Sequence, residues 1–291
     1  MNRRLTGLAS VLLCALAVTA AAQTPGTLPE YGDEHYRPRS GQSGKDVVWV
    51  PTPDALVARM LQAAGTTDKD VVYDLGAGDG KIPIAAARDF KARAVGIEYN
   101  PEMAALAERN AQRAGLADRV QIITGDIFEK DFSEATVVTL YLLPELNLKL
   151  RPRILAMKPG TRVVSHQFKM GDWEPDESIV ESFRDAYLWI VPANVAGRWS
   201  FREERGDWTA TADLVQSLQR VGGTLTLGEK PQPLLSPALA GATLTFFFVD
   251  GDGQSRSVRG TVTGDRFEGW LRFPSYESRV TGQRAPAPRK S

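Results

Sequence analysis

Three acidic residues stand at or just beyond the ends of short apolar segments, where their side chains can reach a bound ligand. Asp74 is followed by a glycine-rich loop, Glu98 ends a second apolar segment, and Asp126 follows a third. Ionised carboxylates attract cations and accept hydrogen bonds from hydroxyl and amino groups. The spacing of these acids therefore predicts a site for a polar or cationic small molecule.

The loop after Asp74 departs from the dinucleotide-binding pattern. Gly76, Gly78 and Gly80 let the backbone approach a ligand closely and adopt positive φ angles. In a nicotinamide or flavin site two residues separate the second glycine from the third, and the following helix receives a diphosphate. Here Asp79 alone separates them, and its carboxylate would repel a diphosphate. The loop favours a cationic ligand without phosphate, such as S-adenosylmethionine, which carries a sulfonium and an ammonium group.

The two later acids suit the remaining parts of such a ligand. Glu98 lies 22 positions after Gly76, at the tip of the next predicted strand, where an acid can bind the hydroxyl groups of a ribose. Asp126 can accept a hydrogen bond from an adenine amino group, with Ile127 packed against the ring. Open α/β sheets bind ligands at the carboxyl ends of their strands, so we expect one site to contain all three acids.

The elements that position these acids alternate between strands and helices. A helix capped by Asp54 precedes the first strand. Strands are predicted at residues 71–75, 94–98, 120–124, 136–140 and 162–168, and later helices up to residue 90, at 101–114 and at 144–157. This alternation predicts an α/β fold of the Rossmann-like kind over residues 46–195, with a parallel sheet and helices on both faces.

The pattern changes after Val195. Six short segments of alternating polarity, separated by glycine-rich turns, predict a small C-terminal antiparallel β module, a sandwich or a barrel, over residues 196–283. The predicted strands are residues 197–204, 208–216, 221–227, 242–249, 257–263 and 267–273. We expect it to assist substrate capture and not to bind the cofactor. Asp250 begins an acidic, glycine-containing stretch that is predicted to be a hairpin turn. Residues 23–45 are predicted to be a flexible arm, and residues 284–291 a disordered tail.

The first 22 residues have the layout of a secretory signal peptide. Arg3 and Arg4 supply positive charge, residues 5–18 contain no charged side chain, and small alanines follow. We expect a periplasmic or secreted protein without a stable membrane span after cleavage; a membrane-anchored or cytoplasmic protein is the alternative. Cys14 is the only cysteine and lies in this leader, so the mature chain has no disulfide, cysteine metal site or cysteine nucleophile. No metal site of another kind is predicted.

The segments DLGAGDG, VGIEYN and GDIFE, in this order and spacing, closely resemble the motifs of class I S-adenosylmethionine-dependent methyltransferases. The resemblance covers residues 46–193 and implies a Rossmann-like methyltransferase sheet. It also implies that Asp74, Gly76 and Gly78 surround the methionine moiety of the cofactor, with Glu98 at the ribose and Asp126 at the adenine.

Two further segments are similar to one branch of that superfamily. VVWVPTPDALVARML precedes the loop, and TVVTLYLLPELNLKLRPRILAMKPGTRVVSHQF follows it. Relatives in this branch include bacterial proteins of unknown substrate and mitochondrial protein-lysine methyltransferases. The similarity implies that Val50, Pro51 and Thr52 form part of the cofactor entrance.

The strand at residues 136–140 should end beside the reactive methyl group. Enzymes that methylate exocyclic amines of bases resemble one another in carrying Asn- or Asp-Pro-Pro-Tyr there, but this chain reads Tyr-Leu-Leu-Pro from Tyr141. The 35 basic and 35 acidic residues cancel, which gives no electrostatic footprint for nucleic acid. We therefore expect no nucleic-acid partner. Tyr141 either positions an amine acceptor or packs in the core.

His166, near the end of the following predicted strand, is either a general base or positioning residue or a structural histidine. Asp172 and Trp173 either line the opening of the same ligand site or pack in a loop.

The sequence thus predicts an S-adenosylmethionine-dependent methyltransferase acting on an amine, with a protein lysine as the finer hypothesis. The alternatives are methylation of a small molecule and an exported S-adenosylmethionine-binding protein without turnover. The acceptor is an unknown protein or small molecule.

Overall fold

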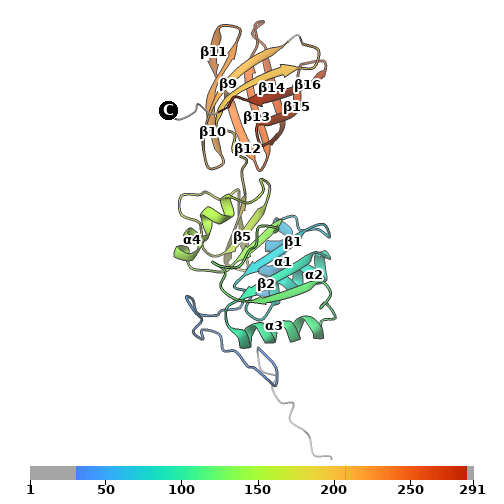
Figure 1. Ribbon diagram of the computed structural model, residues 1–291, viewed down its shortest axis with the longest axis vertical. Coiled ribbons are helices and arrows are strands. Elements are labelled where there is room, and N and C mark those ends of the chain that lie inside the picture. Colours follow the sequence, from blue (N-terminus) through green and yellow to red (C-terminus); the bar gives the residue numbers. More distant parts are fainter. Residues whose placement is uncertain (1–30, 207, 287–291) are drawn as a thin grey trace, which may run out of the picture.

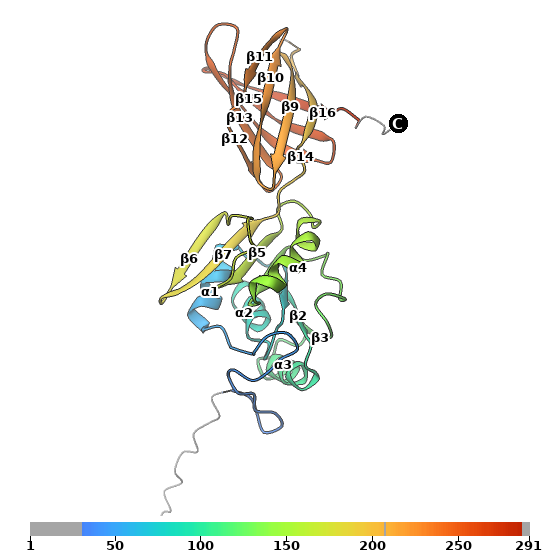
Figure 2. The ribbon, with the colours of Figure 1, turned by 90° about the vertical axis from the view of Figure 1, so that its left-hand side faces the viewer.

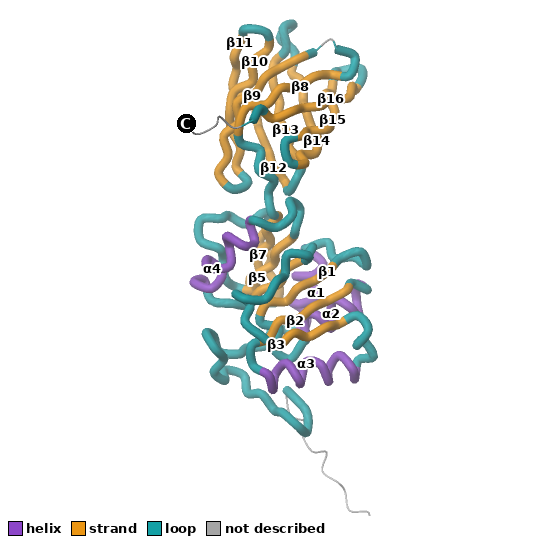
Figure 3. Tube along the Cα trace, viewed as in Figure 1, coloured by secondary structure: helices purple, strands orange, loops and turns teal. Residues whose placement is uncertain are grey.

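The computed structural model describes residues 31–206 and 208–286. Figure 1 shows an α/β part and an all-β part stacked along the long axis, and Figure 3 shows helices only in the α/β part of the described residues. The predicted signal peptide lies outside the described residues, as do the last five residues of the predicted tail. No helix in the described ranges combines the length and apolar character needed to cross a membrane.

The α/β part contains a seven-stranded sheet with the order β3-β2-β1-β4-β5-β7-β6. Its strands are β1 (Val71–Leu75), β2 (Arg93–Glu98), β3 (Val120–Thr124), β4 (Val137–Leu140), β5 (Arg162–His166), β6 (Glu177–Glu181) and β7 (Arg184–Ile190). Its helices are α1 (Asp54–Ala63), α2 (Lys81–Phe90), α3 (Pro101–Arg113) and α4 (Pro144–Leu155). Strands β1 to β5 are parallel. The strand order reverses at β1, so a ligand crevice is expected at the carboxyl ends of β1, β2 and β4.

The two faces of this sheet bury different side chains, because side chains alternate along each strand. Val72 and Val137 pack into one cluster with residues of α1 and α2. Tyr73 and Val138 point to the other face and pack with Leu150 of α4. Helices therefore cover both faces, and the predicted Rossmann-like fold is confirmed.

Local sequence explains where the two helices beside the crevice begin. Helix α2 starts directly after Gly80, which has a φ of +81° and so occupies the left-handed region that suits glycine. Helix α3 starts after Asn100, whose side chain accepts hydrogen bonds from the N–H groups of Glu102 and Met103. Pro101 occupies the first helical position, where no intrahelical donor is needed.

Strands β6 and β7 form a hairpin that the strand–helix pattern does not predict. β7 runs antiparallel to both β5 and β6, so the sheet is mixed and not wholly parallel. The turn between β6 and β7 places Ser182 and Phe183 at φ angles of +51° and +63°. Glycine, asparagine and aspartate usually supply this conformation. Because none of them stands at the turn, the sequence carries no local hairpin signal.

The all-β part is a nine-stranded antiparallel sheet with the order β11-β10-β9-β8-β16-β15-β14-β13-β12. Its strands are β8 (Gly197–Glu203), β9 (Thr209–Ser217), β10 (Arg220–Leu227), β11 (Lys230–Pro233), β12 (Leu235–Ala240), β13 (Thr243–Val249), β14 (Ser255–Thr263), β15 (Arg266–Arg272) and β16 (Glu277–Arg284). The sheet curls around one core (Figure 2) that includes Trp199, Phe246 and Phe267. Gln232 of β11 exchanges two hydrogen bonds with the backbone of Val249 in β13, so the two ends of the sheet approach each other.

Three of these strands, β11, β12 and β16, were not among the predicted segments. β11 contains Pro231 and Pro233, and β12 contains Pro237. Proline interrupts a central strand but is tolerated at an edge, and both strands are edges. β16 ends at Arg284, the first residue of the predicted tail. The predicted hairpin turn is confirmed between β13 and β14, where the Asp250 carboxylate accepts two backbone N–H groups.

The all-β part joins the sheet at the edge opposite the ligand crevice. The N–H of Ala193 donates to the carbonyl of Gly241 at 2.8 Å, and Gly241 lies against Gly160, which precedes β5. Because β5 runs from this junction towards the crevice, the module lies at the amino ends of the strands. This arrangement places the module away from the carboxyl ends of the strands, where the crevice lies. Its expected part in substrate capture stays a prediction.

Candidate functional site

A cavity of about 710 Å³ lies at the carboxyl ends of β1, β2, β3 and β4. Eight of the nine residues predicted to bind the cofactor line it: Pro51, Thr52, Asp74, Gly76, Asp79, Glu98, Asp126 and Ile127. Tyr141 also lines it, whereas Gly78 and His166 do not. No described residue of the all-β part contributes to the lining. The structure thus brings the three acid-ended strands of the sequence to one edge of the sheet.

The glycine-rich loop forms the floor of this cavity. The N–H groups of Gly76 and Ala77 both donate to the carbonyl of Ile97, which fixes the loop against β2. Gly76 and Gly78 have φ angles of +88° and +56°. A Cβ atom on Gly78 would stand 2.4 Å from Nε1 of Trp49, so the segment that carries Trp49 lies directly on the loop. A larger residue at Gly78 would separate the two.

Asp74 is a buried carboxyl group with one close hydrogen-bond donor. The hydroxyl of Thr139 donates to Oδ1 of Asp74 at 2.7 Å. Burial, opposed by the Thr139 hydrogen bond and assisted by the charges of Glu98 and Asp79, raises the pKa of Asp74 to about 7. An unpaired buried carboxylate is costly, so this site is suited to a ligand that brings positive charge.

Glu98 and Asp79 share the same cavity. Oε2 of Glu98 accepts the N–H of Gly78 at 2.8 Å, and Oε1 accepts the N–H of Asn100 at 2.9 Å. Burial raises the pKa of Glu98, and burial likewise raises the pKa of Asp79 although Lys81 lowers it. In all, five acidic and two basic side chains line the cavity. The excess of acid fits the sulfonium and ammonium groups of S-adenosylmethionine and would repel a diphosphate.

Asp126 stands at the far end of the cavity, beyond β3. Its Oδ1 accepts the N–H of Phe128 at 2.9 Å, and its Oδ2 pairs with the ammonium group of Lys45. The Lys45 hydrogen bond holds the pKa of Asp126 below its ordinary value. Lys45 also lies 5.0 Å from the ring centroid of Tyr99. Sequence reasoning missed Lys45, because a lysine in a loop carries no signal of its contacts.

The described part of the predicted arm lies along the α/β part. Asp33 is buried, and Nε of Arg109 in α3 donates to its carboxylate at 2.7 Å. Further on, the rings of Trp49 and Tyr31 pack nearly perpendicular to each other with their centroids 5.3 Å apart, and residues 42–52 line the cavity. This segment therefore forms a wall of the site. His35, which the sequence did not assign to the site, has an exposed side chain.

Tyr141 and His166 meet at the β4 side of the cavity. Their ring centroids are 3.8 Å apart, and Nδ1 of His166 lies 3.0 Å from the hydroxyl of Thr52. His166 is buried, and burial lowers its pKa to about 4. It is therefore neutral and weakly basic at neutral pH, so the geometry favours a structural or positioning role over general-base catalysis. Its Nε2 has no hydrogen-bond partner among the described residues.

Trp173 and Asp172, the other two candidate residues, do not line the cavity. Trp173 is fully buried, and its ring packs 6.1 Å from that of Trp189. Asp172 is bound by Arg151 on the surface. Trp173 therefore packs in the core, whereas the Asp172 side chain is exposed and neither lines the cavity nor packs.

The residues around Tyr141 that the sequence did not single out are mostly apolar. They line the cavity as Leu142, Leu143, Leu146, Gln167 and Phe168. Arg184, at the start of β7, is the charged group that acts on this end, since its charge contributes after burial to the lowered pKa of His166. The cavity thus has an acidic end and an apolar end that contains no carboxylate.

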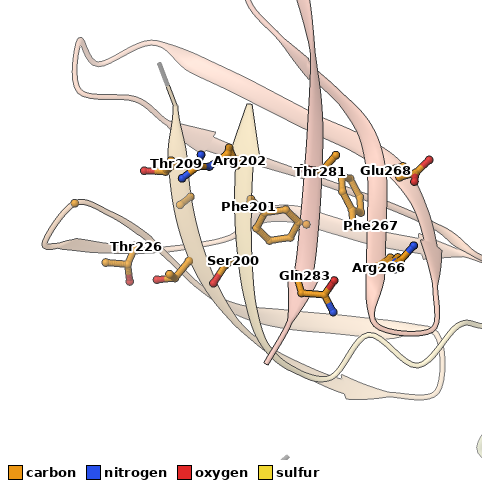
Figure 4. Close-up of a pocket in the computed structure, with 14 residues that line it drawn as sticks. Ser200, Phe201, Arg202, Thr209, Thr226, Arg266, Phe267, Glu268, Thr281 and Gln283 are labelled. Atoms are coloured by element: carbon orange, nitrogen blue, oxygen red, sulfur yellow. The ribbon is translucent and has the colours of Figure 1, made fainter. Parts of the chain in front are cut away.

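A second cavity, of about 640 Å³, lies on the all-β part (Figure 4). Hydroxyl and charged side chains from neighbouring strands line it, among them Ser200, Arg202, Thr209 and Glu268. It contains none of the predicted site residues. No group of three or more His, Cys, Asp or Glu side chains within residues 31–206 and 208–286 is arranged to hold a metal ion.

The part of the chain that forms this cavity is similar to known methyltransferases. Residues 74–177 match the family model described as the ANTKMT methyltransferase domain. The chain is 49% identical over 135 residues to a protein-lysine N-methyltransferase of Saccharolobus islandicus (strain REY15A), a match that covers 46% of this chain and 84% of that protein. It is 35% identical over 105 residues to the adenine nucleotide translocase lysine N-methyltransferase of Mus musculus, over 36% of this chain and 46% of the mouse protein.

One solved structure shares 52% sequence identity with this chain. It is described as an RNA methyltransferase from Salinibacter ruber in complex with S-adenosyl-L-homocysteine; the match covers 50% of this chain and 96% of that one, with a TM-score of 0.49. The chain spans about half the length of the mouse relative and most of the archaeal one.

Proposed function

Since the chain belongs to the class I S-adenosylmethionine-dependent methyltransferases related to protein-lysine methyltransferases, we propose that its acceptor is the side-chain amine of a protein lysine. When bound, S-adenosylmethionine supplies the methyl group that the amine nitrogen receives. The observation that carries the lysine proposal is the contrast between the two ends of one cavity. The cofactor end is acidic, whereas the end at Tyr141 is apolar and lacks carboxylates.

We assign the cofactor contacts from the geometry of the acidic end. Asp74 and Asp79 supply negative charge for the cationic methionine part. Both carboxylate oxygens of Glu98 accept a hydrogen bond from a backbone N–H group, and their remaining lone pairs can accept from the ribose hydroxyls. Asp126 accepts from the adenine amino group once it shares or releases Lys45. The raised pKa values of Asp74, Asp79 and Glu98 support the assignments made for these three acids.

The apolar end is suited to an uncharged amine. A lysine ammonium is not nucleophilic, and no lining residue near Tyr141 offers a carboxylate to stabilise it. An apolar surrounding and the positive charge of Arg184 both favour the neutral amine. Tyr141 is held in place by His166 and by its hydroxyl contact with Gln167 at 3.3 Å. In this proposal the chain contributes alignment and exclusion of water, and the acceptor loses its proton to solvent.

Labelled S-adenosylmethionine incubated with fractionated lysate and this protein tests the proposal. We expect label in protein, and specifically on lysine after digestion. Label confined to the metabolite fraction would replace it with small-molecule methylation. Binding of the cofactor without label in any fraction would support the binding protein without turnover.

We also propose that the mature protein is exported. This rests on the charge, apolar run and small residues of the first 22 positions alone. N-terminal sequencing of protein from fractionated native cells tests it. A mature chain beginning near residue 23 in the periplasm or medium supports export, and Met1 on soluble cytoplasmic protein contradicts it.

A further inference from the structure

We propose that the acceptor lysine lies between apolar neighbours in its own polypeptide, and that Val50 and Leu143 of this chain receive those neighbours. The inference rests on the proposed lysine methylation and names the kind of segment that the site selects. It concerns the rim of the cavity, where Leu143 takes no part in the assigned cofactor contacts and Val50 belongs to the segment that the sequence placed at the cofactor entrance.

Val50 and Leu143 are apolar side chains that remain exposed at the cavity. They are 36% and 41% exposed, and both belong to its lining. Val48, 57% exposed, extends the same apolar surface along the wall segment. Apolar side chains around a functional cavity indicate a surface that another molecule covers.

The two residues belong to segments that meet beside Tyr141. Leu143 follows Tyr141 by two positions, at the turn into α4. Val50 precedes Thr52 by two positions, and the Thr52 hydroxyl contacts the His166 ring that lies against Tyr141. Val50, Thr52, Tyr141 and Leu143 all line one cavity. We place the entry of the acceptor between Val50 and Leu143, where the residues next to the lysine would contact them.

The charge distribution decides which neighbours fit. All five acidic side chains of the cavity belong to the carboxyl ends of β1, β2 and β3, the glycine-rich loop, or the wall at Asp46. Around Tyr141 the lining is uncharged. A segment with charged residues beside its lysine would lose their hydration there without gaining an ionic partner from the lining, to which Arg184 does not belong. A segment with apolar neighbours would bury them, which favours its binding.

Two peptides and three variants test the inference. One peptide carries a single lysine between leucines, and its twin carries the same lysine between aspartates. Methyl transfer from labelled S-adenosylmethionine gives kcat/KM for each. We expect a preference of about tenfold for the apolar peptide, the lower end of what one methylene group produces in an apolar pocket. We expect Leu143→Ser and Val50→Ser each to reduce this preference severalfold.

The matched control is Val215→Ser. Val215 is 65% exposed on β9 of the all-β part and lines neither cavity, so this change should leave the preference intact. Leu143 is the N-cap residue of α4 and makes no capping hydrogen bond, so a serine there can cap the helix and keep it folded. Thermal unfolding of each variant verifies folding.

Equal kcat/KM for the two peptides, or a preference unchanged in both rim variants, would overturn the inference and leave lysine methylation standing. If neither peptide is a substrate, the lysines labelled in lysate decide: apolar neighbours support the inference, and acidic or random neighbours overturn it. Absence of methyl-lysine in lysate as well would refute the proposed function itself, and the inference with it.

Discussion

The affinity for S-adenosylmethionine should depend on the protonation of Asp74. Burial raises its pKa to about 7. The carboxyl is therefore ionised in roughly nine molecules of ten at pH 8 and in roughly one of ten at pH 6. If the ionised form holds the cationic cofactor, affinity falls about tenfold between pH 8 and pH 6, which corresponds to about 1.4 kcal/mol.

The variant Asp74→Asn isolates this effect. An asparagine keeps an oxygen to accept from the Thr139 hydroxyl but cannot ionise. We expect it to bind the cofactor more weakly at pH 8 and to lose the tenfold dependence on pH. Calorimetric titration of both proteins at pH 6, 7 and 8 gives the comparison. A wild-type affinity that is constant over this range, or an equal slope in the variant, would refute the reasoning.

The same carboxyl also gives a signed effect on stability. Its folded pKa lies above the value in an unfolded chain, so the folded state binds more protons through this group. The resulting loss of stability is complete above the folded pKa of about 7, shrinks as the pH falls below 7, and disappears only below the ordinary value of 3.8. Without cofactor, Asp74→Asn should therefore raise the unfolding Tm most at pH 8, raise it less at pH 5 and have little effect below the ordinary value of 3.8. A lower Tm at pH 8 would show that the group is needed for folding.

Four further outcomes are expected. Glu98→Gln should weaken cofactor binding by about 1.5–3 kcal/mol in the same titration, because a charged acceptor is lost; unchanged affinity would remove Glu98 from the site. Gly78→Ala should impair cofactor binding, because the new Cβ would clash with Trp49 at a left-handed φ; normal affinity would show that the wall segment is dispensable. His166→Asn should leave the shape of the kcat/KM profile above pH 6 unchanged, because the pKa of His166 is about 4; loss of an ionisation from that profile would make His166 the base. A chain shortened to end at Val195 should bind the cofactor if it folds, and a folded but non-binding chain would contradict the division into two parts.

Much of the α/β part follows from local patterns. The apolar strands that run into Asp74 and Glu98 repeat at the spacing of strand–helix units, and parallel strands bring their carboxyl ends to one edge. That rule alone predicts that these acids share a cavity with Asp126. What it cannot predict is whether Tyr141 and His166 touch, since their contact depends on the packing of β4 against β5.

The remaining differences between the prediction and the structure arise where the local sequence carries no signal or a misleading one. Phe183 has a left-handed backbone conformation in a turn for which the sequence carries no local signal. Pro231 would interrupt a central strand, but it is tolerated in β11 because β11 lies at the edge of the sheet. The contacts of Lys45 and Trp49 join a loop to distant strands. No periodicity encodes such contacts, because loop side chains follow the surface on which they pack.

The transfer of a methyl group to lysine is the claim that most needs a direct measurement. Lysate proteins can be incubated with this protein and S-adenosylmethionine that carries a deuterated methyl group, and their peptides sequenced by mass spectrometry. We predict that the mass of one or more deuterated methyl groups lies on lysine, and that Asp74→Asn greatly reduces this signal at pH 8. Deuterated methyl groups found only on RNA, on metabolites or on residues other than lysine would contradict the account.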